Sequence, residues 1–181
     1  SLAKYSKGLV ALSACLKGEI PLSLGMGKYQ KAVQAAGEFK DIFENGDFYL
    51  ELQDHNLSEQ KEINVQLVKM AKELSLPLVA TNDVHYLVKS NARAHEILLC
   101  VQTQTTLDDP NRLKFRTEEF YFKSPEEMKK IFQELPQAIA NTVEIARKCN
   151  LELEFSQLHL PQYVPPDGKE KDVLLKELCQ E

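Results

Sequence analysis

Short hydrophobic runs alternate with longer segments of helical periodicity in the first half of the chain. Three runs have the length and the aliphatic or aromatic side chains of buried strands, and they cover residues 8–15, 48–53 and 76–80. Between them, hydrophobic residues recur every three or four positions over residues 28–43 and 58–74, as on one face of a helix. This alternating order predicts an α/β fold with parallel strands joined by right-handed crossovers.

The second half of the chain has a mainly helical pattern. Residues 89–102 carry hydrophobic side chains on one side of a predicted helix, and residues 120–122 suit a short strand. Ser124, with Glu127 three positions later, has the spacing of a capping box that begins a helix. A further helix is predicted to begin at Pro136, because proline is favoured at the first helical position.

Prolines and a glycine accumulate after residue 160, which is typical of a linker. We therefore expect one domain over residues 1–160, and a linker with the first helix of another domain over residues 161–181. The chain begins without Met and stops inside the apparent helix "DVLLKELCQE". Because three strand units are also too few to close a barrel, we interpret the chain as a piece of a longer protein.

Composition narrows the class of protein. Hydrophobic residues make up 43% and charged residues 27% of the chain, as in ordinary globular proteins. The net charge of −5 gives no basic footprint, so any surface that grips DNA should lie mostly elsewhere. No hydrophobic run approaches the roughly 20 residues that span a bilayer, and we expect a cytoplasmic protein that does not bind membranes. The four cysteines lack CxxC spacing, which argues against a zinc ribbon and favours reduced thiols.

Candidate chemistry follows the three predicted strands. Asp83 and His85 come directly after the third strand, and side chains two apart on an extended chain point the same way. Cys15 ends the first strand, and the carboxyl ends of parallel strands form one functional edge. A carboxylate and an imidazole suit zinc, manganese or iron, so this edge is a candidate metal site.

Each of these residues also has a simpler interpretation. Asp83 and His85 form a short pattern that is equally typical of capping or of a structural hydrogen bond, and Cys15 of a small buried side chain. The remaining histidines are interpreted as loop or structural residues without a catalytic role: His55, His95 and His159. The sequence contains no P-loop, serine nucleophile elbow or dinucleotide-binding glycine pattern.

Several blocks, in order, strongly resemble the family of bacterial DNA polymerase III alpha subunits. They are "GLVALSACLKGEIP", "FYLELQDHNLSEQKEIN", "LPLVATNDVHYL", "AHEILLCVQTQTTLDDPNR" and "PQAIANTVEIARKCNLELEF". The resemblance implies the second half of a PHP domain, a distorted (β/α) barrel, followed by the start of a polymerase palm. It also implies that Cys15, Asp83 and His85 are metal ligands. The family's other metal ligands would precede Ser1, and the polymerase carboxylates would follow Glu181, so no catalytic residue is assigned here.

The resemblance further implies a DNA-directed DNA polymerase that uses Mg²⁺, with zinc or manganese at the PHP site. Its substrates would be DNA and deoxynucleoside triphosphates, and its partners a proofreading exonuclease subunit and a sliding clamp. The PHP site would either stabilise the protein or support 3′ to 5′ proofreading, and the isolated segment would be inactive. Two alternatives stay open: a docking module for the exonuclease subunit, and a free-standing PHP-type phosphoesterase.

Overall fold

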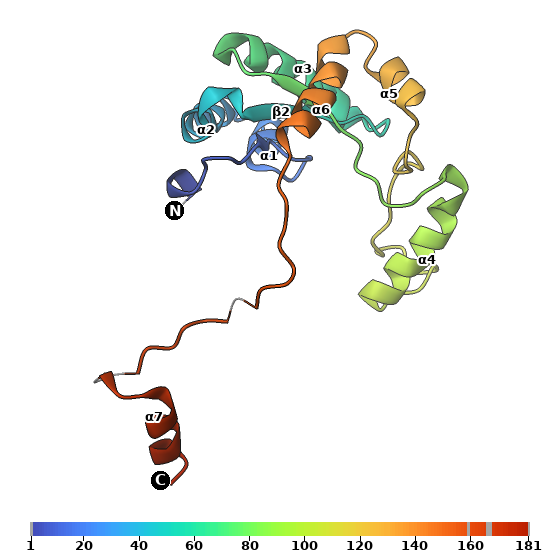
Figure 1. The fold of residues 1–181 in the computed structure, drawn as a ribbon. Helices are drawn as coiled ribbons and strands as arrows, with labels where there is room; N and C mark the ends of the chain where they lie inside the picture. The colour runs from blue at the N-terminus through green and yellow to red at the C-terminus, as the bar shows by residue number, and fades with distance from the viewer. Residues whose placement is uncertain (1, 159, 166–167, 181) are drawn as a thin grey trace. The chain divides into compact units, whose positions relative to one another are not determined.

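A sheet of three parallel strands forms the centre of the first part of the molecule (Figure 1). In this computed structural model the described residues are 2–158, 160–165 and 168–180. The strands are β1 (Ala11–Leu12), β2 (Phe48–Leu52) and β3 (Leu78–Ala80), in the order β1-β2-β3. The parallel α/β organisation predicted from the sequence is confirmed.

The first strand is much shorter than the hydrophobic run that predicted it. Ala14 adopts a left-handed backbone conformation with φ of 64°, which no regular strand accommodates. Just before it, the Ser13 side chain accepts a hydrogen bond from the backbone N–H of Glu51 at 2.8 Å. A side chain therefore takes over from the backbone ladder where β1 ends.

Helices account for most of the remaining regular structure. The α-helices are α1 (Glu19–Gly25), α2 (Tyr29–Ile42), α3 (Ser58–Leu74), α4 (Ala92–Thr103), α5 (Pro125–Ile131), α6 (Pro136–Lys148) and α7 (Lys171–Leu178). Short 3₁₀ turns are η1 (Leu2–Lys4), η2 (Glu44–Gly46) and η3 (Lys89–Asn91). The predicted capping box at the start of α5 is present, since Ser124 and Glu127 bond each other's backbone N–H groups. The predicted strand at 120–122 is instead a single bridge between Tyr86 and Tyr121.

The hydrophobic core lies between the sheet and the helices that follow each strand. Helix α3 packs against β2, α6 packs against β3, and α1 packs against both α2 and α3 (Figure 1). Leu50 and Leu52 of β2 and Met70 of α3 are fully buried in this core. Because buried apolar surface is the main favourable term in folding, these contacts fix the sheet.

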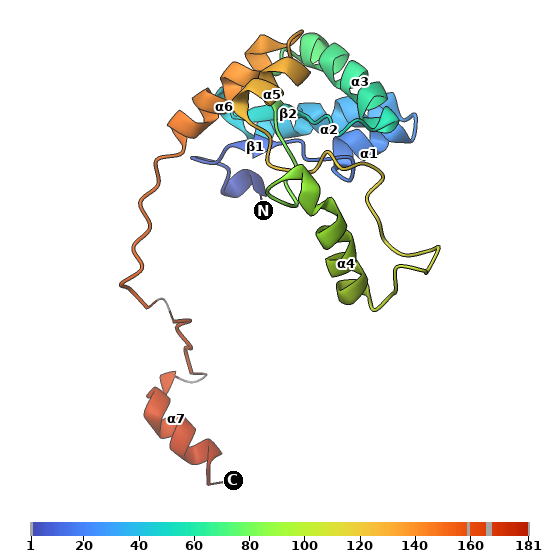
Figure 2. The same cartoon turned by 90° about the vertical axis from the view of Figure 1, so that its right-hand side faces the viewer.

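Helix α6 joins the sheet from a distant part of the sequence. The Asn141 side chain donates a hydrogen bond to the Leu78 carbonyl of β3 at 2.7 Å, and Lys148 pairs with Asp47 at 2.7 Å. Helix α4 lies away from the sheet in both ribbon views (Figures 1 and 2). The chain runs from the carboxyl end of β3 out to α4 and then returns toward α5 (Figures 1 and 2).

Residues Ser1–Cys149 form one compact unit and Asn150–Glu181 a second, of which α7 is the helix. The predicted division at residue 160 into a PHP part and the entry to a palm stays a prediction. His159 lies outside the described residues. Over the described ranges, none of the helices has the length and apolar character needed to cross a membrane.

Truncation of Leu52 tests the importance of this core. We expect Leu52→Ala to lower the free energy of unfolding by about 2–5 kcal/mol, because it removes a fully buried side chain and leaves a cavity. Leu98→Ala, on the exposed side of α4, is the matched control and should change it by less than about 0.5 kcal/mol. Urea unfolding of both variants makes the comparison, and equal losses would contradict this placement of the core.

Candidate metal site at the carboxyl ends of the strands

The register of β2 and β3 brings the loops that follow them into line. Leu52 pairs with Ala80, and the Thr81 N–H continues the ladder by donating to the Leu52 carbonyl at 3.0 Å. His55 and Asp83 each lie three residues beyond this last pair. Parallel pairing therefore delivers an imidazole and a carboxylate to neighbouring positions at the same edge of the sheet.

Asp83 and His85 lie side by side, as their spacing on an extended segment predicts. The Nε2 atom of His85 is 3.2 Å from Oδ1 of Asp83, and their side chains are 36% and 40% exposed. The His85 backbone N–H donates to the Phe120 carbonyl at 2.8 Å, which anchors the segment. The pair is thus accessible from solvent while its backbone is held in place.

Aromatic rings surround the imidazole of His85. The ring of Phe115 meets it edge-on with centroids 4.6 Å apart, and those of His95 and Phe120 lie at 5.4 and 5.7 Å. His95, on α4, also packs against Phe115 at 4.9 Å. Burial lowers the pKa of His95, and the nearby His85 lowers it further. These ring contacts connect α4 and the segment after it to the candidate site.

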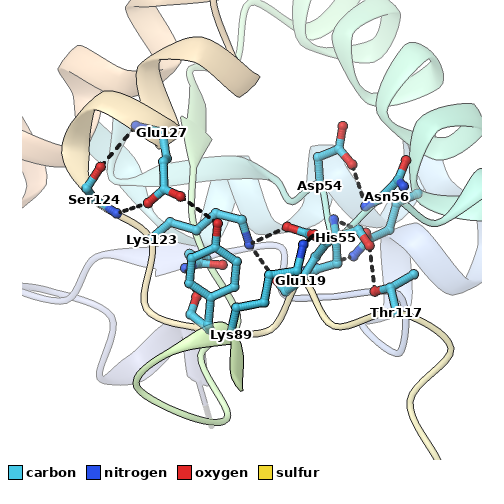
Figure 3. Close-up of polar contacts among 12 residues, drawn as sticks. Asp54, His55, Asn56, Lys89, Thr117, Glu119, Lys123, Ser124 and Glu127 are labelled. Carbon is cyan, nitrogen blue, oxygen red and sulfur yellow. Dashed lines mark hydrogen bonds and ion pairs between the residues drawn. The ribbon is translucent and has the colours of Figure 1, made fainter. Parts of the chain in front are cut away.

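His55 is the most buried histidine of this edge, with 1% of its surface exposed. Its ring stacks on Phe120 with centroids 4.2 Å apart and planes inclined by only 3°. Its backbone carbonyl accepts a hydrogen bond from the Thr117 hydroxyl at 2.7 Å (Figure 3). The sequence places His55 correctly in the loop after β2, but it gives no sign of this burial.

Burial lowers the pKa of His55, and the positive charge of Lys123 lowers it further. The carboxylate of Asp83 and the polar side chains of Asn82 and Gln60 act in the opposite direction without reversing the shift. The imidazole is therefore neutral near pH 7.

Lys123 is a buried cation at the same edge, with only 2% of its side chain exposed. Its ammonium group donates to the Glu119 carbonyl and lies 3.7 Å from the Glu119 carboxylate (Figure 3). It also lies 4.4 Å from the centre of the Tyr121 ring. Burial lowers the pKa of Lys123, while the charges of Glu119 and Glu127 oppose that shift. Lys89 pairs with the same Glu119 carboxylate at 2.5 Å.

Cys15 lines a small depression together with Glu51, Gln53 and Gln60. Among the described residues, no three His, Cys, Asp or Glu side chains come close enough to hold a metal ion together. The structure thus brings Asp83 and His85 together and does not add Cys15 to them. The metal-binding role of all three remains a prediction.

The Asp83–His85 pair itself fits a divalent ion. Two donors each about 2.1 Å from a tetrahedral ion are separated by roughly 3.4 Å, close to the distance observed here. The pair supplies a carboxylate oxygen and an imidazole nitrogen, both of which zinc and manganese accept. Two donors are half of a tetrahedral set, so this edge fits part of a metal site.

Comparison with protein families identifies a match in the first part of the chain. Residues 1–55 match the model of the PHP domain, a stretch that includes Cys15 and His55 and ends before Asp83 and His85. The first part of the chain is therefore similar in sequence to the PHP domain.

Individual proteins similar to this chain align with nearly all of it. It is 39% identical over 178 residues to DNA polymerase III subunit alpha of Treponema pallidum, with 98% of this chain aligned. The same subunit is 42% identical over 184 residues in Thermus aquaticus (98% of this chain) and 45% over 166 residues in Borreliella burgdorferi (91%). The aligned region is 14–15% of the length of these relatives. The chain is homologous to one segment of bacterial DNA polymerase III alpha subunits, which confirms the resemblance seen in its sequence.

The lowered pKa values of His55 and His95 predict a loss of stability in acid. Each histidine binds a proton more readily when unfolded, so protonation favours the unfolded state as the pH falls from about 7 toward 5. We expect the Tm to fall over this range, and to fall less steeply in His55→Gln and His95→Gln. Thermal unfolding at fixed ionic strength measures the slopes, and unchanged slopes in both variants would contradict neutral rings at these two positions.

Proposed function

We propose that this chain is a segment of a replicative DNA-directed DNA polymerase. The supporting observation is its alignment over more than nine-tenths of its length with DNA polymerase III alpha subunits. The longer protein would carry out template-directed nucleotidyl transfer on DNA with deoxynucleoside triphosphates and Mg²⁺ in the cytoplasm. The catalytic carboxylates of that reaction are assigned to no residue of this segment.

Within the segment, we propose that Asp83 and His85 hold part of a divalent-metal site, with zinc or manganese as the ion. Their convergent atoms at 3.2 Å support this role, as does their position beside the carboxyl ends of parallel strands. Cys15 would contribute to the wider PHP metal cluster from the end of β1. When bound, such an ion supplies Lewis acidity toward a phosphodiester.

The residues around the pair restrict its geometry. Phe115 and Phe120 limit rotation of the His85 ring, and the Phe120 carbonyl fixes its backbone. Asp83 would supply a carboxylate oxygen to the ion, and His85 its Nε2 nitrogen. The partly exposed pair would then either strengthen the fold when loaded or act in 3′ to 5′ proofreading.

A docking role is a second candidate, favoured by the surface of α4. Ile97, Leu98 and Val101 on this helix are 46%, 63% and 70% exposed, and the chain carries a net charge of −5. Such a surface suits a protein partner better than a DNA backbone. A proofreading exonuclease subunit or another replicase component, such as a sliding clamp, would be that partner. A free-standing phosphoesterase is disfavoured, because similarity to the polymerase subunit continues far beyond the PHP match.

A metal titration tests the proposed site in the full-length chain that contains this segment. We expect the variant Asp83→Ala with His85→Ala to weaken binding of Zn²⁺ or Mn²⁺ by at least about tenfold, because two donors are lost. Isothermal titration calorimetry measures the affinity. His95→Ala is the control, since its ring packs against His85 and is not a proposed ligand.

Equal affinities in the wild type and the double variant would overturn the metal assignment. An assay of 3′ nucleotide release from DNA distinguishes a metal-loaded site that acts in proofreading from one that only stabilises the fold. Loss of metal-dependent release in Asp83→Ala supports proofreading. Retained release together with a lower Tm supports a stabilising ion.

A further inference from the structure

Gln60 determines which nitrogen of His55 carries the proton. The Gln60 Oε1 atom accepts a hydrogen bond from the His55 backbone N–H at 2.8 Å, which fixes the orientation of the amide. Its Nε2 atom, 3.0 Å from the ring Nδ1, must then be the donor of the second bond. A neutral imidazole that accepts at Nδ1 carries its hydrogen on Nε2.

This Nε2–H group is buried and has no hydrogen-bond partner among the described residues. A buried donor without an acceptor is unfavourable, and native proteins rarely leave one unmatched. The ring cannot turn to find an acceptor, because Gln60 holds one edge and Phe120 covers one face. The amide of Asn82 lies close enough to raise the pKa of His55, but its Nδ2 donates to the Tyr121 carbonyl and it makes no hydrogen bond with Nε2. An acceptor for the Nε2–H must therefore move to the ring.

Asp83 is the acidic side chain best placed to do so. It lies at the position in the β3 loop equivalent to His55 in the β2 loop, given the Leu52–Ala80 pairing. Both His55 and His85, the neighbour of Asp83, pack on the ring of Phe120. Lys123 is the other charged group near His55, and as an ammonium it offers no acceptor.

We propose that His55 is a positioning residue of the metal site, and that its Nε2–H donates a hydrogen bond to the Asp83 carboxylate when the site is loaded. One carboxylate oxygen is then held by His55 and the other is directed to the ion. This role rests on the proposed metal site at Asp83 and His85. A nitrogen that carries a hydrogen has no lone pair for a metal, so His55 is not itself a ligand. A phosphate arriving from solvent is also disfavoured, because Nε2 is buried.

Two substitutions of His55 in the full-length chain test the donor. Glutamine places an amide N–H close to the position of the histidine Nε2–H, whereas phenylalanine keeps the ring and removes the donor. We expect His55→Phe to weaken Mn²⁺ or Zn²⁺ binding by about 10–100-fold, as loss of other partners of metal ligands does, and His55→Gln to restore most of that loss. Calorimetric titration measures the affinity, and the Tm of the metal-free protein reports stability separately.

Thr117→Val is the matched control, because it removes the hydrogen bond to the His55 carbonyl and leaves the ring nitrogen untouched. It should bind metal as the wild type does. Wild-type affinity in His55→Phe would overturn the positioning role, and so would equal weakening in the Phe and Gln variants, which is the behaviour of a direct ligand. If Asp83→Ala also binds as the wild type does, the metal site itself is wrong, and the two failures are thereby distinguished.

Discussion

The pairing of β2 with β3 is the constraint on which the rest of the candidate site depends. A shift of one residue between Leu52 and Ala80 would turn each following side chain to the opposite face and separate His55 from Asp83. Burial maintains this register, because Leu50 and Leu52 face a closed core and a slip would expose them. Hydrophobic packing some distance away thus fixes the position of groups that are themselves polar.

Aromatic contacts extend this order beyond the sheet. Phe115 and Phe120 belong to the segment that returns from α4, yet they contact histidines from the loops after both β2 and β3. The single bridge between Tyr86 and Tyr121 holds the two sides of this arrangement together. The candidate site is therefore assembled from three stretches of sequence, and aromatic rings in stacked and edge-on contact join them.

The sequence predicts the elements whose signals are local. Helices α2 and α3 follow from hydrophobic periodicity, the start of α5 from its capping box, and the Asp83–His85 contact from alternation along an extended chain. Helix α1 carries no comparable signal, because the glycines and the proline of this stretch are typical of a loop with a single helical turn. Pro21 nevertheless lies in the first turn of the helix, where no N–H is required.

Contacts between distant residues left no such signal. The burial of His55 and its hydrogen bonds with Gln60 depend on where α3 packs. The stacking of His55 on Phe120 joins residues 65 positions apart in the chain. The separation of Cys15 from the Asp83–His85 pair is equally invisible in the sequence, since all three follow predicted strands.

The amide group of Gln60 decides which nitrogen of the His55 ring carries the hydrogen. A glutamate of the same shape could still accept from the His55 backbone, but a carboxylate has no hydrogen to offer Nδ1. The ring would then keep its hydrogen on Nδ1 and carry a lone pair on the buried Nε2. Replacing one nitrogen by oxygen would thus convert His55 from a donor into a potential ligand, and the ligand set of the proposed metal site would change through a residue that is not part of it.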